Sequence, residues 1–299
     1  MDMTHCTLCP RECGADRTTG RGRCGAGALP RLARAALHRW EEPCISGSDP
    51  ARGSGAVFFS GCPLRCCFCQ NEQISSGGFG KEIPVSRLAE IFLELQEAGA
   101  WNINLVSAAQ YLPQVIEALE QTRGRLEIPV VYNSGGYEKA ESLRLLEGLV
   151  DIYLPDLKFM DPALAEACAG APDYFLVASA AILEMARQTG PLRLGEDGML
   201  KRGLIVRHLV LPGQREDSAA LLRWLAGALP TESFYLSLMS QYTPLRPQPL
   251  KALNRRVASL EYGYLQQLAE ELGFQGFGQE RTSAKEEYTP AFDLTGVEG

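Results

Sequence analysis

The placement of the ten cysteines constrains this chain more than any other feature of its sequence. Eight of them fall into two short clusters, one within residues 6–24 and one within residues 62–69. Secreted proteins that depend on disulfides spread their cysteines through a small domain and carry an export signal. This chain opens MDMTHCTLCP, without the basic and apolar regions of a signal peptide. Clustered thiols in such a chain are more often metal ligands, so each cluster is predicted to bind metal.

Length and composition are those of a globular protein. The 299 residues are 45% hydrophobic and 22% charged, which excludes a disordered or collagen-like chain. No apolar run approaches about 18 residues, so we expect no contact with a membrane and a cytoplasmic location. The net charge of −7 argues against a nucleic-acid partner. Residues 1–40 nevertheless hold seven arginines against three acids, which is either a contact for an anionic partner or a solvated surface.

From Gly55 onward, short apolar runs alternate with amphipathic segments, a pattern typical of βα units around a parallel sheet. The predicted strands are Ala56–Ser60, Ile103–Ser107, Ile128–Asn133, Asp151–Leu154, Leu204–Leu211 and Phe234–Ser240. The predicted helices are Val85–Ala98, Leu112–Thr122, Glu138–Glu147, Pro162–Ala169, Tyr174–Gln188, Asp217–Leu229 and Leu260–Leu272. Six strands with outer helices favour a partial (βα)6 barrel, and a doubly wound open sheet is the alternative.

The sequence therefore predicts an α/β protein in three parts. Residues 1–50 are rich in Cys, Arg and Gly without a long periodic segment, so we expect a loop-rich, metal-binding amino-terminal arm. Residues 51–280 contain the βα units and form the partial barrel. Residues 281–299 are a polar carboxy-terminal tail that we expect to be loop-like.

The second cluster carries the chemistry. Cys62, Cys66 and Cys69 have the spacing C-x3-C-x2-C directly after the first predicted strand, and the odd thiol Cys67 is interpreted as non-ligating. A [4Fe–4S] cluster usually has four cysteine ligands, so three in one loop leave one iron open. The amine and carboxylate of S-adenosylmethionine can chelate that iron, and the reduced cluster can then release a 5′-deoxyadenosyl radical. A zinc knuckle or a ferredoxin-like electron carrier is the alternative, but both need a fourth nearby ligand.

The spacing, with the aromatic Phe68 before the last cysteine, resembles the radical S-adenosylmethionine (SAM) superfamily. In that family the aromatic residue lies near the adenine. The segments GSGAVFFSGCPLRCCFCQNEQIS, VYNSGGYE and DIYLPDLK further resemble uncharacterised homologues of the pyruvate formate-lyase activating enzyme, over nearly the whole chain. This resemblance implies hydrogen abstraction from a glycine or another residue of a partner protein. It also implies a reductant such as flavodoxin or ferredoxin.

The resemblance implies further cofactor-binding residues at the carboxyl ends of the predicted strands. Activating enzymes carry Gly-Gly-Glu after the second strand, and this chain departs from that pattern with Asn104 and Ser107 in the corresponding stretch. Asn133 and Ser134 end the third strand, where the family has an acidic residue and a hydroxyl. After the fourth strand the family's Asp-x-Lys is present.

Asp156 and Lys158 form that Asp-x-Lys motif, in which the lysine pairs with the carboxylate of SAM. Arg207 and His208 lie in the fifth strand, where one member of a charged pair usually points inward, and both are predicted to contact the cofactor. Glu41, just before the barrel, either closes over it or lies on the surface, and the same holds for its neighbour Glu42.

The first cluster consists of Cys6, Cys9, Cys13 and Cys24. Four thiolates within nineteen residues suit tetrahedral zinc or a second [4Fe–4S] cluster, and sulfur ligation alone does not decide between them. We expect this site to be mainly structural.

Three functions remain open at this point: a radical enzyme acting on a protein, a radical enzyme acting on a small molecule, and a non-enzymatic iron–sulfur or zinc module. The three-cysteine loop favours the two enzymes over the module, because a module would have two saturated sites.

Overall fold

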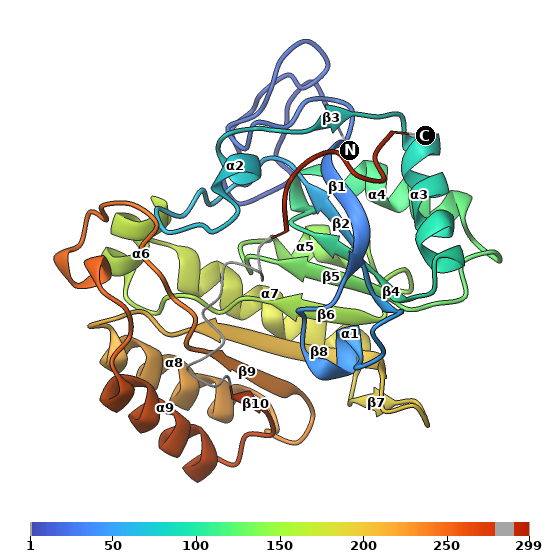
Figure 1. Ribbon diagram of the computed structural model, residues 1–299. Helices are drawn as coiled ribbons and strands as arrows, with labels where there is room; N and C mark the ends of the chain where they lie inside the picture. The colour runs from blue at the N-terminus through green and yellow to red at the C-terminus, as the bar shows by residue number, and fades with distance from the viewer. Residues whose placement is uncertain (1, 279–289, 299) are drawn as a thin grey trace.

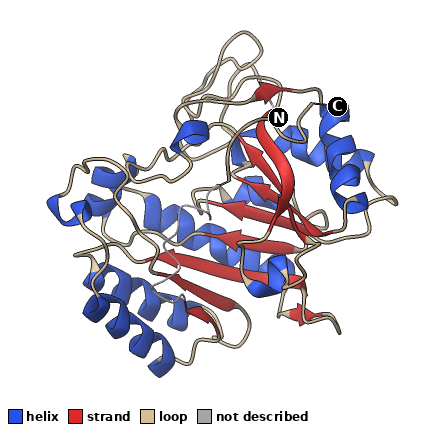
Figure 2. Cartoon of the chain, viewed as in Figure 1, coloured by secondary structure: helices blue, strands red, loops and turns tan. Residues whose placement is uncertain are grey.

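The computed structural model describes residues 2–278 and 290–298, and its centre is one twisted sheet (Figures 1 and 2). The strands are β1 (Arg31–His38), β2 (Gly53–Phe59), β3 (Lys81–Glu82), β4 (Ala100–Val106), β5 (Val130–Ser134), β6 (Ile152–Pro155), β7 (Arg193–Leu194), β8 (Leu200–Leu209), β9 (Tyr235–Met239) and β10 (Gly276–Gly278). They lie in the order β10-β9-β8-β6-β5-β4-β2-β1-β3, with β7 paired to β8. The strands from β2 to β10 along this path are parallel, and their arrowheads point the same way in Figure 1.

All six predicted strands and all seven predicted helices are confirmed. The helices are α3 (Val85–Glu97), α4 (Leu112–Gln121), α5 (Ala140–Arg144), α6 (Pro162–Ala169), α7 (Tyr174–Thr189), α8 (Arg215–Ala228) and α9 (Ser259–Glu271), with two short additions, α1 (Pro43–Ser46) and α2 (Glu72–Ser75). Helix α5 is half its predicted length. Lys139 before it is extended, and after Arg144 the chain tightens into turns that end at Gly148, whose φ is +80°.

The two faces of the sheet have different partners, because successive side chains in a strand point to opposite sides. One face, with residues such as Val57, Leu105 and Tyr153, packs against α3, α4 and α7 in the main core. The other face holds two small clusters, one of which joins Val131 and Ile205 to α1. The long helices thus cover one face only, and in the described residues the two edges of the sheet do not pair. This is the predicted partial barrel rather than the doubly wound alternative.

Residues 31–38 were expected to be part of a loop-rich arm, and they instead form β1, antiparallel to β2. The run Arg-Leu-Ala-Arg-Ala-Ala-Leu-His lacks the β-branched residues by which strands are recognised. Of the predicted polar tail, residues 281–289 and 299 lie outside the described residues. Residues 290–298 lie against β1, where Ala35 N donates to Thr295 O at 2.8 Å. Gly296 is required there, because a Cβ would lie 2.0 Å from Ala35 O.

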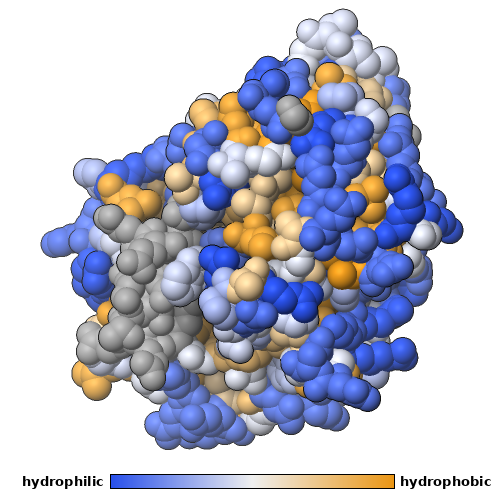
Figure 3. Space-filling view, turned by 45° about the vertical axis from the view of Figure 1, so that its right-hand side comes forward, coloured by the Kyte–Doolittle hydropathy of each residue, from blue (hydrophilic) through white to orange (hydrophobic). Residues whose placement is uncertain are grey.

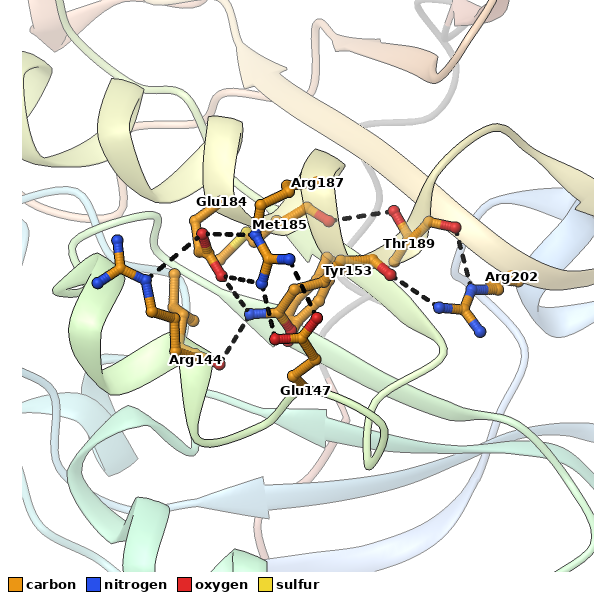
Figure 4. Close-up of polar contacts among 10 residues, drawn as sticks. Arg144, Glu147, Tyr153, Glu184, Met185, Arg187, Thr189 and Arg202 are labelled. Atoms are coloured by element: carbon orange, nitrogen blue, oxygen red, sulfur yellow. Dashed lines mark hydrogen bonds and ion pairs between the residues drawn. The ribbon is translucent and has the colours of Figure 1, made fainter.

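Helix α7 is fixed to the outer face by the polar contacts drawn in Figure 4. Tyr153 on β6 donates to Gln188 at 2.6 Å, and Arg202 on β8 donates to the carbonyls of Gln188 and Thr189 at 2.7 and 3.0 Å. These bonds connect α7 to the two strands whose ends border the cavity described below. Arg187 lies between Glu147 and Glu184 in the same view, but half of its side chain is exposed, so these ion pairs add little stability.

The surface is mixed in character. On the face drawn in Figure 3, hydrophilic residues predominate and apolar residues lie in small groups. None of the helices in residues 2–278 and 290–298 has the length and apolarity needed to cross a membrane.

Candidate functional site

A cavity of about 260 Å³ lies where the parallel strands end. The predicted site residues that line it are Cys62, Cys66, Phe68, Cys69, Ser107, Asn133, Ser134, Asp156, Lys158 and Arg207. They come from five different strands or the loops that follow them, and only the parallel arrangement brings them to one place. The carboxyl ends of barrel strands are where such folds build their sites.

The loop after β2 carries the three cysteines and is fixed at its start. Gly61 has φ +90°, and a Cβ there would lie 2.5 Å from Cys24 O, so only glycine fits. Gln110 donates to Gly61 O at 2.9 Å, and the next amide, Cys62 N, donates to Cys24 O at 3.0 Å. Arg11 donates to Pro63 O at 2.9 Å. The amino-terminal arm therefore supports the cysteine loop directly.

The three thiols of this loop are close enough to influence one another's ionisation. Burial raises the pKa of Cys62 to about 11, and the neighbouring Cys69 acts in the same direction. Burial also raises the pKa of Cys66, whereas the ammonium of Lys158 acts in the opposite direction. Ser75 donates to Cys69 Sγ at 3.3 Å. Burial thus favours the neutral thiol at Cys62 and Cys66, and a metal would have to displace these protons on binding.

The donor atoms that this loop offers are three cysteine sulfurs. Within residues 2–278 and 290–298, no three His, Cys, Asp or Glu side chains lie close enough to hold one metal ion. Ligands of a [4Fe–4S] cube bind different irons and are spaced more widely than ligands of one ion. Cysteine thiolates are the ligands that such clusters take.

Asp156 and Lys158 form an ion pair at the cavity wall, with side chains 24% and 17% exposed. Burial alone would lower the pKa of Lys158, but Asp156 and Cys66 together raise it above its ordinary value. Their loop is held by Tyr174, whose hydroxyl oxygen accepts from Lys158 N at 3.0 Å and lies 2.9 and 2.8 Å from the carbonyl oxygens of Gly135 and Asp156, which share its one proton. Tyr174 was missed from the sequence, because it belongs to helix α7 and no motif marks it.

The floor of the cavity is a buried charged group. Arg207 donates to Glu42 at 2.5 and 2.8 Å and also pairs with Glu41. Burial opposes ionisation of Glu42, but the guanidinium of Arg207 holds its pKa below the ordinary value. Glu41 and Glu42 are therefore not surface residues, and they pair with Arg207 instead of closing over the barrel. Arg207 lines the cavity but is already bound by two carboxylates.

Asn104 and His208 were predicted at the cofactor and are not among the residues that line the cavity. Asn104 is buried below it and donates to Glu41 at 2.9 Å, so it holds the floor. His208 points to the other face of the sheet, where Nδ1 lies 2.6 Å from Leu157 O and Nε2 lies 2.8 Å from Ser218 Oγ. The alternation of β8 explains this placement, because Arg207 faces inward and its neighbour must face outward.

Phe68 lies between the cavity and the aromatic rings of Tyr242 and Phe159. Its ring centroid is 5.9 Å from that of Tyr242 and 6.1 Å from that of Phe159. The ring therefore has a fixed orientation in the cavity wall, where a flat base could pack on it.

The thiols of the amino-terminal cluster also lie near one another. Burial raises the pKa of Cys9 to about 11, with smaller contributions from the other three cysteines of the set. A Cβ on Gly22 would lie 3.4 Å from Cys24 Sγ and 3.5 Å from Cys13 Sγ. The buried Arg17 lies 3.9 Å from Cys6 Sγ. A metal on Cys6, Cys9, Cys13 and Cys24 stays a prediction.

The chain is similar to known proteins over most of its length. A family model described as the Radical SAM superfamily matches residues 56–225, more than half of the chain. An uncharacterized protein of Methanocaldococcus jannaschii is 27% identical over 277 residues, covering 89% of this chain and 74% of that protein.

Solved structures give a more distant likeness. A radical SAM methyltransferase from Sphaerobacter thermophilus is 15% identical with a TM-score of 0.50, over 77% of this chain and 67% of the other. SuiB of Streptococcus suis, solved with S-adenosylmethionine bound, is 12% identical with a TM-score of 0.49, over 76% of this chain and 50% of its own. At 15% identity, the methyltransferase shows a shared fold alone.

Proposed function

This chain belongs to the Radical SAM superfamily, and we propose that it binds a [4Fe–4S] cluster through Cys62, Cys66 and Cys69 and abstracts a hydrogen atom from a partner protein. Membership makes it an enzyme of the radical SAM type, and the family implies a [4Fe–4S] cluster and SAM. When bound and reduced, these two groups supply a 5′-deoxyadenosyl radical. The assignment of residues to them rests on the cavity described above.

One observation carries the proposal: three cysteines of a single loop line the cavity together with an ammonium group. A loop with three ligands leaves one coordination position for SAM. Lys158 is the nearby cation that can pair with a carboxylate, and a compact ammonium group suits this role. Asp156 holds Lys158 in place, and Ser107 and Ser134 offer hydroxyl groups on the same wall. Phe68 is proposed to pack against the adenine.

We propose a protein rather than a small molecule as the substrate. Pockets that enclose a drug-sized ligand have volumes of about 300–1,000 Å³. The cavity of about 260 Å³ lies just below this range, so the cluster and SAM would leave no enclosed room for a further small molecule. A substrate that inserts only one residue, such as a glycine of a partner chain, needs little more. The likeness of the sequence to activating enzymes supports the same choice.

Several finer assignments belong to the same proposal. Residues 1–50 are the metal-binding arm, 51–280 the radical SAM barrel and 281–299 a tail, although β1 joins the arm to the sheet. The electron is proposed to come from a flavodoxin or ferredoxin in the cytoplasm. The metal of the arm, zinc or a second cluster, is proposed to be structural, since the arm contacts the cysteine loop through Cys24 and Arg11.

Adjacent cysteines provide a test with a matched control. Cys66→Ala removes a proposed ligand, whereas Cys67→Ala changes the next residue of the same loop. After anaerobic reconstitution and reduction with SAM present, the first variant should release no 5′-deoxyadenosine above background and the second should release it. Equal release from both variants would contradict the assignment of the ligands.

A further inference from the structure

Glu138 is a buried carboxyl group behind the cavity wall. Its side chain is 6% exposed, and its hydrogen bond is to Ser134 Oγ at 3.1 Å. Ser134 lines the cavity, but Glu138 does not. The ammonium of Lys158, whose charge acts on Glu138, is paired with Asp156. The hydroxyl group of Ser134 is thus the hydrogen-bonded link between Glu138 and the cavity.

The hydrogen bonds of Ser134 depend on whether Glu138 carries a proton. A hydroxyl group has one donor and two acceptor positions. Gly136 N already donates to Ser134 Oγ at 3.3 Å. If Glu138 is ionised, Ser134 must donate to it, and the remaining lone pair faces the cavity. If Glu138 is protonated, it donates to that lone pair, and the Ser134 proton is free to point into the cavity.

We propose that Glu138 is a positioning residue whose proton directs the Ser134 hydroxyl toward the carboxylate of bound SAM. The inference rests on the proposed function, because it takes SAM as the ligand of this wall. When Glu138 is protonated, Ser134 presents its hydroxyl proton to the carboxylate, and when Glu138 is ionised, Ser134 presents a lone pair that repels the carboxylate. Affinity for SAM should therefore fall as Glu138 loses its proton.

The surroundings of Glu138 support a proton exchange near neutral pH. Burial raises the pKa of Glu138 to about 8, although the hydrogen bond from Ser134 lowers it. Asp156 also raises it, and Lys158 lowers it. Tyr132 on the same strand as Ser134 and Tyr174 on α7 also face Glu138, and burial keeps both phenols neutral by raising their pKa values.

The test is the pH dependence of SAM binding to the reconstituted, reduced protein. SAM is titrated between about pH 6 and pH 9 and followed by electron paramagnetic resonance of the cluster. In the unsubstituted protein, the loss of this hydrogen bond should raise the dissociation constant by up to about tenfold across this range, since a carboxyl group with a pKa of about 8 is still partly protonated at pH 9. Glu138→Gln keeps a donor toward Ser134 at every pH, so it should lack this rise and keep only the pH dependence that comes from SAM itself.

The variant also controls for other titrating groups. The amine of SAM ionises in this range too, but it does so equally in both proteins. Ser134→Ala should bind SAM weakly, and its dissociation constant should not show the rise with pH that Glu138 causes in the unsubstituted protein. The same rise in Glu138→Gln as in the unsubstituted protein would overturn the inference.

A second readout does not depend on the cofactor. Infrared difference spectra between about pH 6 and pH 9 should show a protonated carboxyl band that is missing in Glu138→Gln. Absence of that band in the unsubstituted protein would overturn the inference even if SAM binds. Failure of the unsubstituted, cluster-loaded protein to bind SAM at any pH, with the band present, would instead overturn the proposed function.

Discussion

Lys158→Met tests the cofactor wall most sharply, because methionine keeps most of the apolar stem and removes only the charge. Lys158 is largely buried, and burial makes an ion pair there stronger than one on the surface. Loss of a hydrogen bond to a charged group costs about 1.5–3 kcal/mol. At about 1.4 kcal/mol per decade, affinity for SAM should fall roughly ten- to a hundredfold. Asp156, left without its partner, adds repulsion of the SAM carboxylate.

The assay is a titration of SAM into the reduced protein, followed by electron paramagnetic resonance of the cluster. Iron content should be unchanged in Lys158→Met, since the lysine is not a proposed ligand. Asp156→Asn should weaken binding less, because the amide still orients the lysine. Lys201→Met is the control, since Lys201 pairs with Asp197 on the exposed β7–β8 hairpin. Unaltered affinity in Lys158→Met would refute the reasoning and leave the carboxylate of SAM without a proposed partner.

Three further predictions concern stability. Arg207→Met leaves two buried carboxylates unpaired and should lower the free energy of unfolding, measured by denaturant titration, by about 3–5 kcal/mol. Arg187→Met on the surface is the control and should lower it by less than about 1 kcal/mol. Burial raises the pKa of Glu138 from 4.5 to about 8, so the folded chain keeps a proton between these values that the unfolded chain has lost. Stability should therefore fall on going from about pH 5 to pH 8, by a few kcal/mol relative to Glu138→Gln, and parallel curves for the two proteins would contradict this. The double variant Cys9→Ser, Cys24→Ser should have a lower melting temperature while cleavage of SAM is little changed. Metal analysis of a chain without Cys62, Cys66 and Cys69 should find zinc or iron in the arm.

The periodic part of the fold could be predicted from the sequence, because the alternation of apolar runs and amphipathic segments reports local burial. The parallel order of the strands then placed Cys62, Asn133 and Lys158 at one end of the sheet. Strand β1 could not be predicted in this way. Its alanines fit against β2 and residues 290–298 of the same chain, and neither contact leaves a trace in the local pattern.

The residues of the candidate site that belong to a sequence motif could be predicted, and those that reach it only through long-range contacts were missed. The Arg207–His208 pair shows the limit, since alternation requires that one of the two face outward but does not say which. The structure turns Arg207 inward, toward Glu41 and Glu42, which come from a segment more than 160 residues away. Similarly, Tyr174 acts on the Asp156 loop only because α7 packs over it.

The central claim is that SAM chelates an iron that the protein leaves open. Electron–nuclear double resonance on the reduced cluster, with SAM labelled by nitrogen-15 in its amine and carbon-13 in its carboxylate, tests it most directly. The account predicts hyperfine coupling of both labels to the cluster in the unsubstituted protein and in Cys67→Ala. A reduced cluster on Cys62, Cys66 and Cys69 that shows neither coupling at saturating SAM would contradict it.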